Sequence, residues 1–288
     1  MRVYILLAAL PLLGAAAPPR HDLVFVRGSM LFVRDANGER SLGHHGTNPV
    51  WAPDGKSIAF EFGNDVVTIR GDGTHERRLV ADAIHPAWSP DGTRLAYTSA
   101  DPANFDVYVV DADGQHPHRL TRGFGVDAAP SWSPDGTRIV YQSQRWCAVR
   151  TLPGCSTQIF VMRADGTHKH RLTSSWSDNA RPRFSPDGSR IVWVRAYLDY
   201  YENLYTGLPD GSRWQVLTAR ADGSHARILT GTRVRAWAPT FTPDGDKIVF
   251  ALERVYPPWH LAAVPATGGP VRLLTHGGRD DSDPDWRR

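Results

Sequence analysis

The chain has 288 residues, of which 41% are hydrophobic and 22% are charged, and its formal net charge is +3. This composition excludes a disordered or fibrous protein, and the interleaving of basic with acidic residues disfavours a nucleic-acid-binding surface. The 26 Gly and 22 Pro residues exceed the average share of these residue types and indicate many turns, hence many short strands rather than long helices.

The first seventeen residues have the pattern of a secretory signal peptide. Arg2 supplies a positive charge, residues 3–13 are apolar, and residues 14–17 read Gly-Ala-Ala-Ala. An apolar stretch of about eleven residues is too short to span a bilayer as a helix, and a retained membrane anchor is the alternative. We therefore predict a signal peptide over residues 1–17, a mature domain over residues 18–288, and a periplasmic or secreted location.

One phrase recurs five times along the mature chain and predicts its architecture. It reads Pro-x-Trp/Phe-x-Pro-Asp-Gly and starts at Pro49, Pro86, Pro130, Pro182 and Pro239. Together with Trp286 in a partial last copy, its aromatic residues recur at intervals of roughly 40–60 residues, which is typical of propeller blades or solenoid units. Pro presets the first φ of a tight turn and Gly accepts the positive φ that ends it, so the Asp between them is expected to be a turn former.

Each copy of the phrase begins a unit of four strands. An alternating apolar run, such as residues 95–97, follows the phrase, and an Asp-Gly pair, such as Asp113-Gly114, follows the next apolar run. Asp-Gly between two apolar runs is the strongest short signal for a hairpin. Each unit therefore predicts four antiparallel strands with two short turns and one variable loop.

The two ends of the chain carry complementary parts of one unit. The last copy stops at Trp286 after one strand, whereas residues 23–38 supply three strands and a turn without the phrase. If the C-terminal strand pairs with the N-terminal strands, six units close into a ring that leaves no half-built sheet. The sequence predicts an all-β fold, a six-bladed β-propeller of four-stranded antiparallel blades whose N- and C-terminal strands share one blade. An open solenoid is the alternative.

These repeats resemble the TolB-type propeller family. The resemblance rests on the Trp-Ser-Pro-Asp-Gly phrase at Trp88 and Trp132, on the Ala-Asp-Gly hairpin, and on the Arg-Leu-Thr strand after it, as at Arg119. It covers essentially the whole mature chain and implies a propeller without the α/β domain that precedes the propeller in TolB. Prolyl-oligopeptidase-like enzymes share these repeats but need an α/β-hydrolase domain with a Gly-x-Ser-x-Gly motif, which this sequence lacks.

Two cysteines, Cys147 and Cys155, lie close together in one variable loop. In an oxidising compartment such a pair is expected to form a local disulfide. A metal pair is the alternative, although the spacing differs from Cys-x-x-Cys and no His lies between the two residues. We therefore predict a disulfide between Cys147 and Cys155.

Function is expected on the face of the molecule that carries the loops of variable length, because the turns of the other face are uniform. Long loops contribute aromatic and Arg side chains, which are typical of protein or glycan recognition but could instead pack inside their own loops. The loops that lead into the first strand of each blade bring polar residues toward the mouth of the channel. The predicted binding residues are Arg145, Trp146, Tyr197, Tyr200, Tyr201, Trp214, Trp259, His85, Asp82, Asp127, Asp178, Arg181, Arg235 and Asp283.

These features predict a binding scaffold for a protein partner in the bacterial cell envelope, with no cofactor and no catalytic residue. A small ligand at the channel mouth is compatible with this prediction, whereas nucleic acid and an integral membrane segment after signal removal are not. The alternative is a metal-assisted lyase or hydrolase acting on sugar or lactone substrates, because carboxylates near His45 and His85 could bind a divalent metal or act as acid and base. Local capping of backbone N–H groups is the simpler explanation for these carboxylates. A purely structural module is a third possibility.

Overall fold

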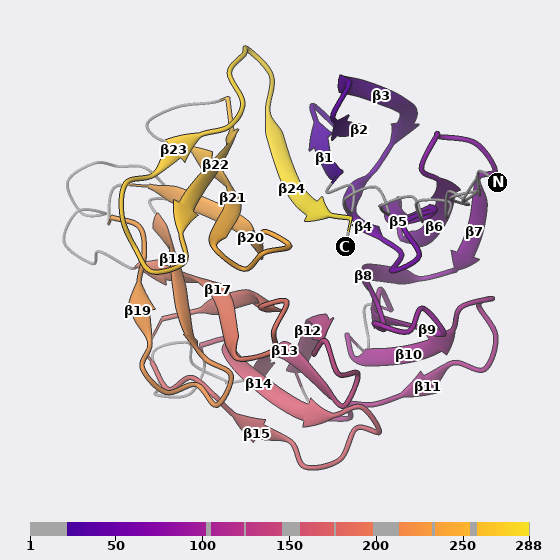
Figure 1. Ribbon diagram of the computed structural model, residues 1–288. Helices are drawn as coiled ribbons and strands as arrows, with labels where there is room; N and C mark the ends of the chain where they lie inside the picture. Colours follow the sequence, from indigo (N-terminus) through magenta and orange to yellow (C-terminus); the bar gives the residue numbers. More distant parts are fainter. Residues whose placement is uncertain are drawn as a thin grey trace, which may run out of the picture.

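The computed structural model describes residues 22–101, 105–123, 125–145, 156–175, 177–197, 213–231, 234–253 and 258–287. Within these ranges the only regular secondary structure is the β-strand. Groups of four strands follow one another around a common centre (Figure 1). The predicted all-β fold of four-stranded antiparallel sheets is therefore confirmed. In these ranges we find no helix with the length and apolar character needed to cross a bilayer.

One sheet contains both ends of the described chain. Its strands lie in the order β24 (Asp281–Trp286), β1 (Leu23–Arg27), β2 (Met30–Asp35) and β3 (Gly38–His45), and each pair is antiparallel. Side chains reinforce the pairing of β24 with β1. Arg27 Nε donates to Asp281 Oδ1 at 2.6 Å, and Arg287 Nη1 donates to Asp22 Oδ2 at 2.9 Å.

Three further sheets each contain four strands that are consecutive in the sequence. The first holds β4 (Thr47–Trp51), β5 (Ser57–Phe62), β6 (Asp65–Arg70) and β7 (Arg77–Val80). The second holds β8 (Ala83–Trp88), β9 (Arg94–Ser99), β10 (Val107–Asp111) and β11 (His118–Arg119). The third holds β12 (Gly125–Trp132), β13 (Arg138–Arg145), β14 (Gln158–Arg163) and β15 (His170–Arg171).

The last two groups of strands are linked into one larger sheet. One group is β16 (Asn179–Phe184), β17 (Arg190–Tyr197), β18 (Arg213–Arg220) and β19 (Arg227–Ile228). The other is β20 (Arg235–Phe241), β21 (Lys247–Glu253), β22 (His260–Pro265) and β23 (Arg272–Leu273). A parallel pair between Trp214 and Arg235 joins β18 to β20, and this link brings two predicted binding residues together.

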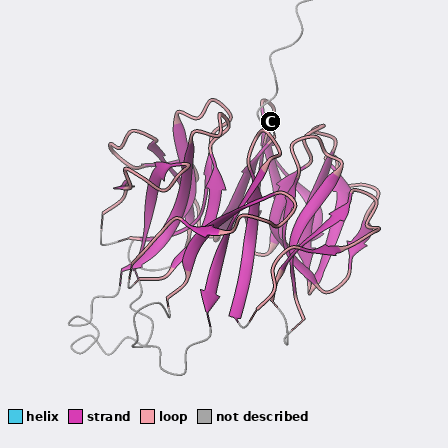
Figure 2. Cartoon of the chain, turned by 90° about the horizontal axis from the view of Figure 1, so that it is seen from below, coloured by secondary structure: helices cyan, strands magenta, loops and turns pink. Residues whose placement is uncertain are grey.

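The strands run between two faces of the molecule, as the side view shows (Figure 2). We call the end with the Pro-Asp-Gly turns and the hairpin glycines the turn face; these glycines are Gly73, Gly114, Gly166 and Gly223. We call the opposite end the loop face. It carries the connections from one group to the next, such as residues 81–82 between β7 and β8, and the turn at Gly63.

The Pro-Asp-Gly turns form as predicted. After Trp132, Ser133 Oγ and the backbone N–H of Thr137 both donate to Asp135 Oδ1, at 2.5 and 3.0 Å, and Gly136 has a φ of 69°. The hydroxyl hydrogen bond from Ser133, followed by that from the Thr137 N–H, lowers the pKa of Asp135 to about 2. Similar side-chain hydrogen bonds recur at Asp91, Asp187 and Asp244, so these residues are turn formers.

A β-bulge interrupts the strand of each group that lies nearest the centre. The ladder register shifts there, and the residue before the first Pro of each phrase has a left-handed φ of 47–56°. A bulge bends its strand and re-aims the side chains next to it, and a following Pro disfavours the right-handed helical region. The six bulge residues are Asn48, His85, Ala129, Arg181, Ala238 and Asp283.

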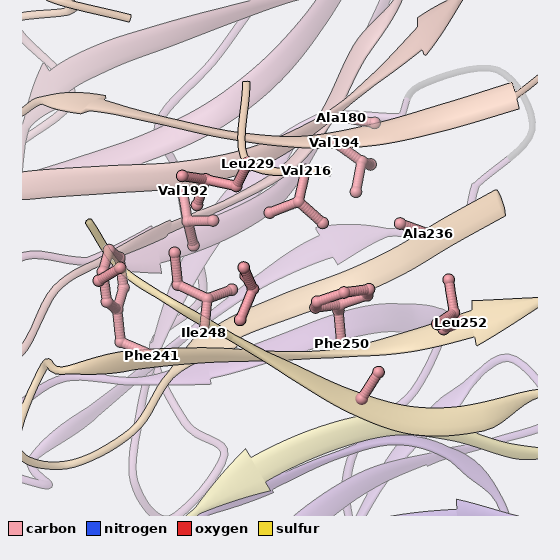
Figure 3. Packing of buried hydrophobic residues seen from close by; sticks show 13 residues of the cluster. Ala180, Val192, Val194, Val216, Leu229, Ala236, Phe241, Ile248, Phe250 and Leu252 are labelled. Carbon is pink, nitrogen blue, oxygen red and sulfur yellow. The ribbon is translucent and has the colours of Figure 1, made fainter. Parts of the chain in front are cut away.

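The hydrophobic core lies between neighbouring groups of strands. In the largest cluster, Val192 and Val216 pack with Phe241, Ile248 and Phe250 of the next group (Figure 3). An Arg side chain from an adjacent group also packs over the ring of the aromatic residue in the repeated phrase. The guanidinium carbon lies 4.8–5.5 Å from the ring centroid in four such pairs: Arg94–Trp132, Arg138–Phe184, Arg190–Phe241 and Arg287–Trp51. Repetition of the phrase therefore joins one group of strands to the next.

Candidate functional site

Three tryptophans form a pocket of about 360 Å³ on the loop face. Trp214 lies at the start of β18, Trp237 in β20, and Trp259 just before β22. The rings of Trp214 and Trp237 meet edge to face, with their centroids 5.3 Å apart. All three side chains are half-buried, so each ring is held in place while part of its surface stays open. The remaining lining residues are Arg235, Ala251, Asp280 and Ser282.

One arginine lines this pocket, and a second packs against one of its tryptophans. Arg235 Nη1 donates to Glu253 Oε2 at 3.1 Å, and the buried Glu253 carboxylate balances its charge. The Arg181 guanidinium lies over Trp237, with Cζ 5.0 Å from the ring centroid, and Arg181 Nη1 donates to Asn48 Oδ1 at 2.6 Å. Because Trp237 contacts Arg181 and Trp214, its ring is already oriented before any ligand arrives.

Trp259 is connected to the closing strand β24. Its backbone N–H donates to Asp280 Oδ1 at 2.7 Å, and its carbonyl oxygen accepts from the backbone N–H of Asp281 at 2.9 Å. The Asp281 carboxylate in turn accepts from Arg27. The position of this ring therefore depends on the pairing of the two chain ends.

His85 lies near the common centre of the strand groups, where it lines a cavity of only about 10 Å³. Burial, and then the charges of Arg181 and Arg183, hold the pKa of His85 well below its ordinary value of 6.5. Its backbone N–H donates to the Glu61 carboxylate, and its Nδ1 lies 3.4 Å from Thr98 Oγ1. The imidazole is therefore neutral near pH 7, which suits a packed side chain better than a charged one.

The predicted carboxylates do not converge on one point. Asp178 Oδ1 accepts from the backbone N–H of Thr157 at 2.7 Å, and Asp283 Oδ2 accepts from Ser282 Oγ at 3.2 Å. Asp82 is exposed at the end of its loop. Among the described side chains, no three His, Cys, Asp or Glu are grouped closely enough to hold a metal ion. Local capping accounts for the contact of Asp178.

The predicted site residues separate into groups. The pocket collects Trp214, Arg235 and Trp259. Two small cavities near the common centre of the strand groups collect His85, Arg181 and Asp283. Asp82, Asp127 and Asp178 line none of these cavities. Arg145 and Tyr197 end β13 and β17. The structure does not describe the side chains of these two residues. Also outside the described residues are Trp146, Tyr200 and Tyr201, the predicted Cys147–Cys155 disulfide and the predicted signal peptide.

Four lining residues were not predicted: Trp237, Ala251, Asp280 and Ser282. A signal for Trp237 exists in the alignment of the repeats. It stands two residues before Pro239, where the other copies have Thr47, Ile84 or a small residue. A bulky aromatic ring at a position that the repeat leaves small or aliphatic marks a local departure from the shared packing.

Comparisons with known proteins agree with this architecture. A family model described as the TolB beta propeller domain matches residues 46–221. An uncharacterized protein from Agrobacterium fabrum is 29% identical over 156 residues, a match that covers 53% of this chain and 48% of the relative. The chain thus matches about half the length of that relative.

Two solved structures show the same fold. TolB from Acinetobacter baumannii superposes with a TM-score of 0.73 at 23% identity, over 93% of this chain and 66% of that one. A proposed TolB from Agrobacterium tumefaciens superposes with a TM-score of 0.67 at 19% identity, over 94% of this chain and 99% of that one. Since the family model covers more than half of the chain, the protein belongs to the TolB β-propeller domain family.

Proposed function

We propose that this protein is an exported binding scaffold whose loop face docks a protein partner in the cell envelope, with the three-tryptophan pocket as the anchor site. One observation carries the proposal: Trp214, Trp237 and Trp259 surround an open cavity of about 360 Å³. Such a cavity can receive one apolar side chain of a partner, while Arg235 and Asp280 offer polar contacts at its edge.

The energetics of protein interfaces support this use of the pocket. Binding energy concentrates in a few residues, among which Trp and Arg are enriched. A ring that is already held loses little conformational entropy on binding. Trp237 is held in this way by Arg181, at 5.0 Å, and by Trp214, at 5.3 Å. The pocket is therefore preorganised rather than assembled by its ligand.

The proposal includes a closed ring of six blades as the rigid base of the pocket. Two contacts support closure through β24. This strand pairs with β1 on one side, and Asp285 Oδ2 accepts from the backbone N–H of Trp51 in β4 at 2.9 Å. The envelope location rests on the signal-peptide pattern of residues 1–17 and on membership of the TolB propeller family.

The test is site-specific photo-crosslinking in the producing cell. A photoreactive residue at Ser282, in the pocket lining, should trap a specific envelope protein, and Trp259→Ala should abolish that adduct. With the trapped protein purified, Trp259→Ala should weaken binding by about 2 kcal/mol, roughly 30-fold. Ile228, an exposed residue of β19, provides two controls. A photoreactive residue at this position controls for the place of the probe, and Ile228→Ala controls for the loss of apolar surface. Adducts of equal yield from both positions, or an adduct indifferent to Trp259→Ala, would contradict the proposal.

A further inference from the structure

A second cavity lies at the turn-face end of the channel. Its volume is about 480 Å³, within the roughly 300–1,000 Å³ that small-molecule sites occupy, and its walls contain four indole rings, those of Trp51, Trp88, Trp132 and Trp286. The Pro of every Pro-Asp-Gly turn also lines it. Because these residues all come from the repeated phrase, the repeat itself builds this turn-face chamber.

The chamber is separated from the loop face by arginines. Arg183 lines the chamber and also two cavities beside Arg181, which have volumes of only about 10 and 20 Å³. Spaces of this size hold about one water molecule at most. Arg181 donates to Asn48, 133 positions away in the chain, and so spans the channel. A ligand of the chamber must enter from the turn face, and an extended peptide cannot thread through the ring.

The charges in the chamber favour a neutral ligand. Arg183 and Asp285 both line it, so an ionic ligand would meet a like charge as well as an opposite one. A hydroxyl group, in contrast, can accept a hydrogen bond from a guanidinium and donate one to a carboxylate. A preference for a neutral ligand disfavours nucleotides, whose phosphates are charged, and the volume of about 480 Å³ excludes long peptides.

The indole groups add a second preference. Trp132 Nε1 donates to the Ala87 carbonyl oxygen at 3.2 Å, whereas the buried Nε1 atoms of Trp51, Trp88 and Trp286 have no acceptor among the described residues. If an indole turns so that such an N–H reaches a ligand oxygen, it loses no hydrogen bond that it makes among the described residues, and a buried donor gains an acceptor. The flat ring faces suit apolar C–H surface.

We propose that the turn-face chamber binds a neutral saccharide of one or two rings. A sugar ring offers apolar C–H faces to Trp and Pro side chains, and hydroxyl groups to Arg183, Asp285 and the indole N–H groups. This inference goes beyond the protein-binding function proposed above, because the chamber opens on the opposite face and requires no protein partner.

The test is calorimetric titration of the full chain with neutral monosaccharides and disaccharides, such as glucose, N-acetylglucosamine and maltose, with glucuronate as the charged counterpart. At least one neutral sugar should bind saturably and more tightly than glucuronate. Trp88→Ala should weaken that binding at least about tenfold. Trp88→Phe, which keeps a ring and protects the fold, should weaken it less, and Trp259→Ala should leave it unchanged.

Several outcomes would overturn the inference. One is that no neutral sugar tested binds saturably, and another is that glucuronate binds more tightly than every neutral sugar. A third is sugar binding that Trp259→Ala removes but Trp88→Ala does not. The last result would place the sugar in the loop-face pocket. The first two results leave the crosslinking test untouched, and only the third concerns the loop-face pocket. Failure of the sugar site and failure of the protein-binding proposal can therefore be told apart.

Discussion

On the turn face, the hairpin glycines Gly73, Gly114, Gly166 and Gly223 share φ values between 82° and 89°, whereas connections on the loop face share neither length nor composition. A Cβ atom at Gly114 would lie 2.4 Å from the carbonyl oxygen of Leu79 in the neighbouring group, and one at Gly73 would lie 2.6 Å from that of Leu42. On the loop face, a Cβ at Gly63 or Gly231 would meet nothing within 4 Å.

This difference explains why one face is uniform and the other varies. Each hairpin of the turn face rests on the backbone of the preceding group of strands, so its conformation is part of the contact between groups. At Gly63 and Gly231 the loop-face connections are not pressed against a neighbour in this way, and such positions can accept new side chains at little cost in stability. Gly46, between β3 and β4, is an exception, because a Cβ there would lie 2.6 Å from the Glu61 carbonyl oxygen. The uniform hairpins of the turn face reflect packing between neighbouring groups of strands. A residue that departs from the repeat, such as Trp237, instead marks a candidate binding site.

The largest effect should come from removing the strand that joins the two chain ends. Truncation after Asp280 deletes β24, exposes the edge of β1 and removes the hydrogen bonds of Asp281 to Arg27 and of Asp285 to Trp51. We expect the free energy of unfolding to fall by at least about 4 kcal/mol, measured by urea and thermal unfolding. A truncated protein that melts within about 2 °C of the full chain, a shift worth under about 1 kcal/mol, would show that β24 contributes little to the framework.

The same substitution on the two faces should separate them clearly. Gly114→Ala forces an Ala into a φ of 89° with its Cβ against the Leu79 carbonyl oxygen, and should destabilise by about 2 kcal/mol or more. Gly231→Ala, in open space on the loop face, should change stability by less than about 0.5 kcal/mol. Equal effects in denaturant titrations would remove the distinction between the faces.

The stability of the fold should fall in mild acid because of His85, which lies between the two faces. Its pKa in the folded protein lies well below 6.5, mainly because it is buried, so the unfolded chain takes up the proton first. Stability should therefore be full above pH 6.5 and fall below it, by at most about 1.4 kcal/mol per pH unit. His85→Gln should flatten the stability profile between pH 6.5 and 4.5. An unchanged slope in that variant would assign the acid sensitivity to other groups.

The smallest expected effect concerns the turn-face carboxylates. The pKa of Asp135 is lowered to about 2, first by the Ser133 hydroxyl, so its contribution to stability is full above about pH 4 and is lost as the pH falls toward 2. Asp135→Asn should cost about 1 kcal/mol at pH 7 and reduce the acid sensitivity in that window. Asp82→Asn on the loop face is the matched control, and a loss of stability at pH 7 as large as that of Asp135→Asn would contradict the turn-former assignment.

Much of the fold could be predicted because it is encoded locally. The Pro-Asp-Gly turn needs only the seven residues around it, since Pro and Gly set the φ values and Asp135 receives its hydrogen bonds from residues two positions away. The pairing of β24 with β1 also followed from the complementary half-units at the two ends. Trp214, Trp259 and Arg235 could be predicted as binding residues from their residue types and their place in or near loops. The sequence did not predict that they line one pocket.

The tertiary structure decided which of these side chains meet. Trp214 and Trp237 come from β18 and β20, which adjoin through the Trp214–Arg235 pair, and Trp259, just before β22, meets them in the pocket. Arg181 reaches Asn48 across 133 positions because bulges re-aim both residues toward the centre. The turn-face chamber arises only when all copies of the phrase stand around one axis. Turn chemistry acts within a few residues, whereas cavities depend on strand register and on the angle between neighbouring sheets, which no single repeat contains.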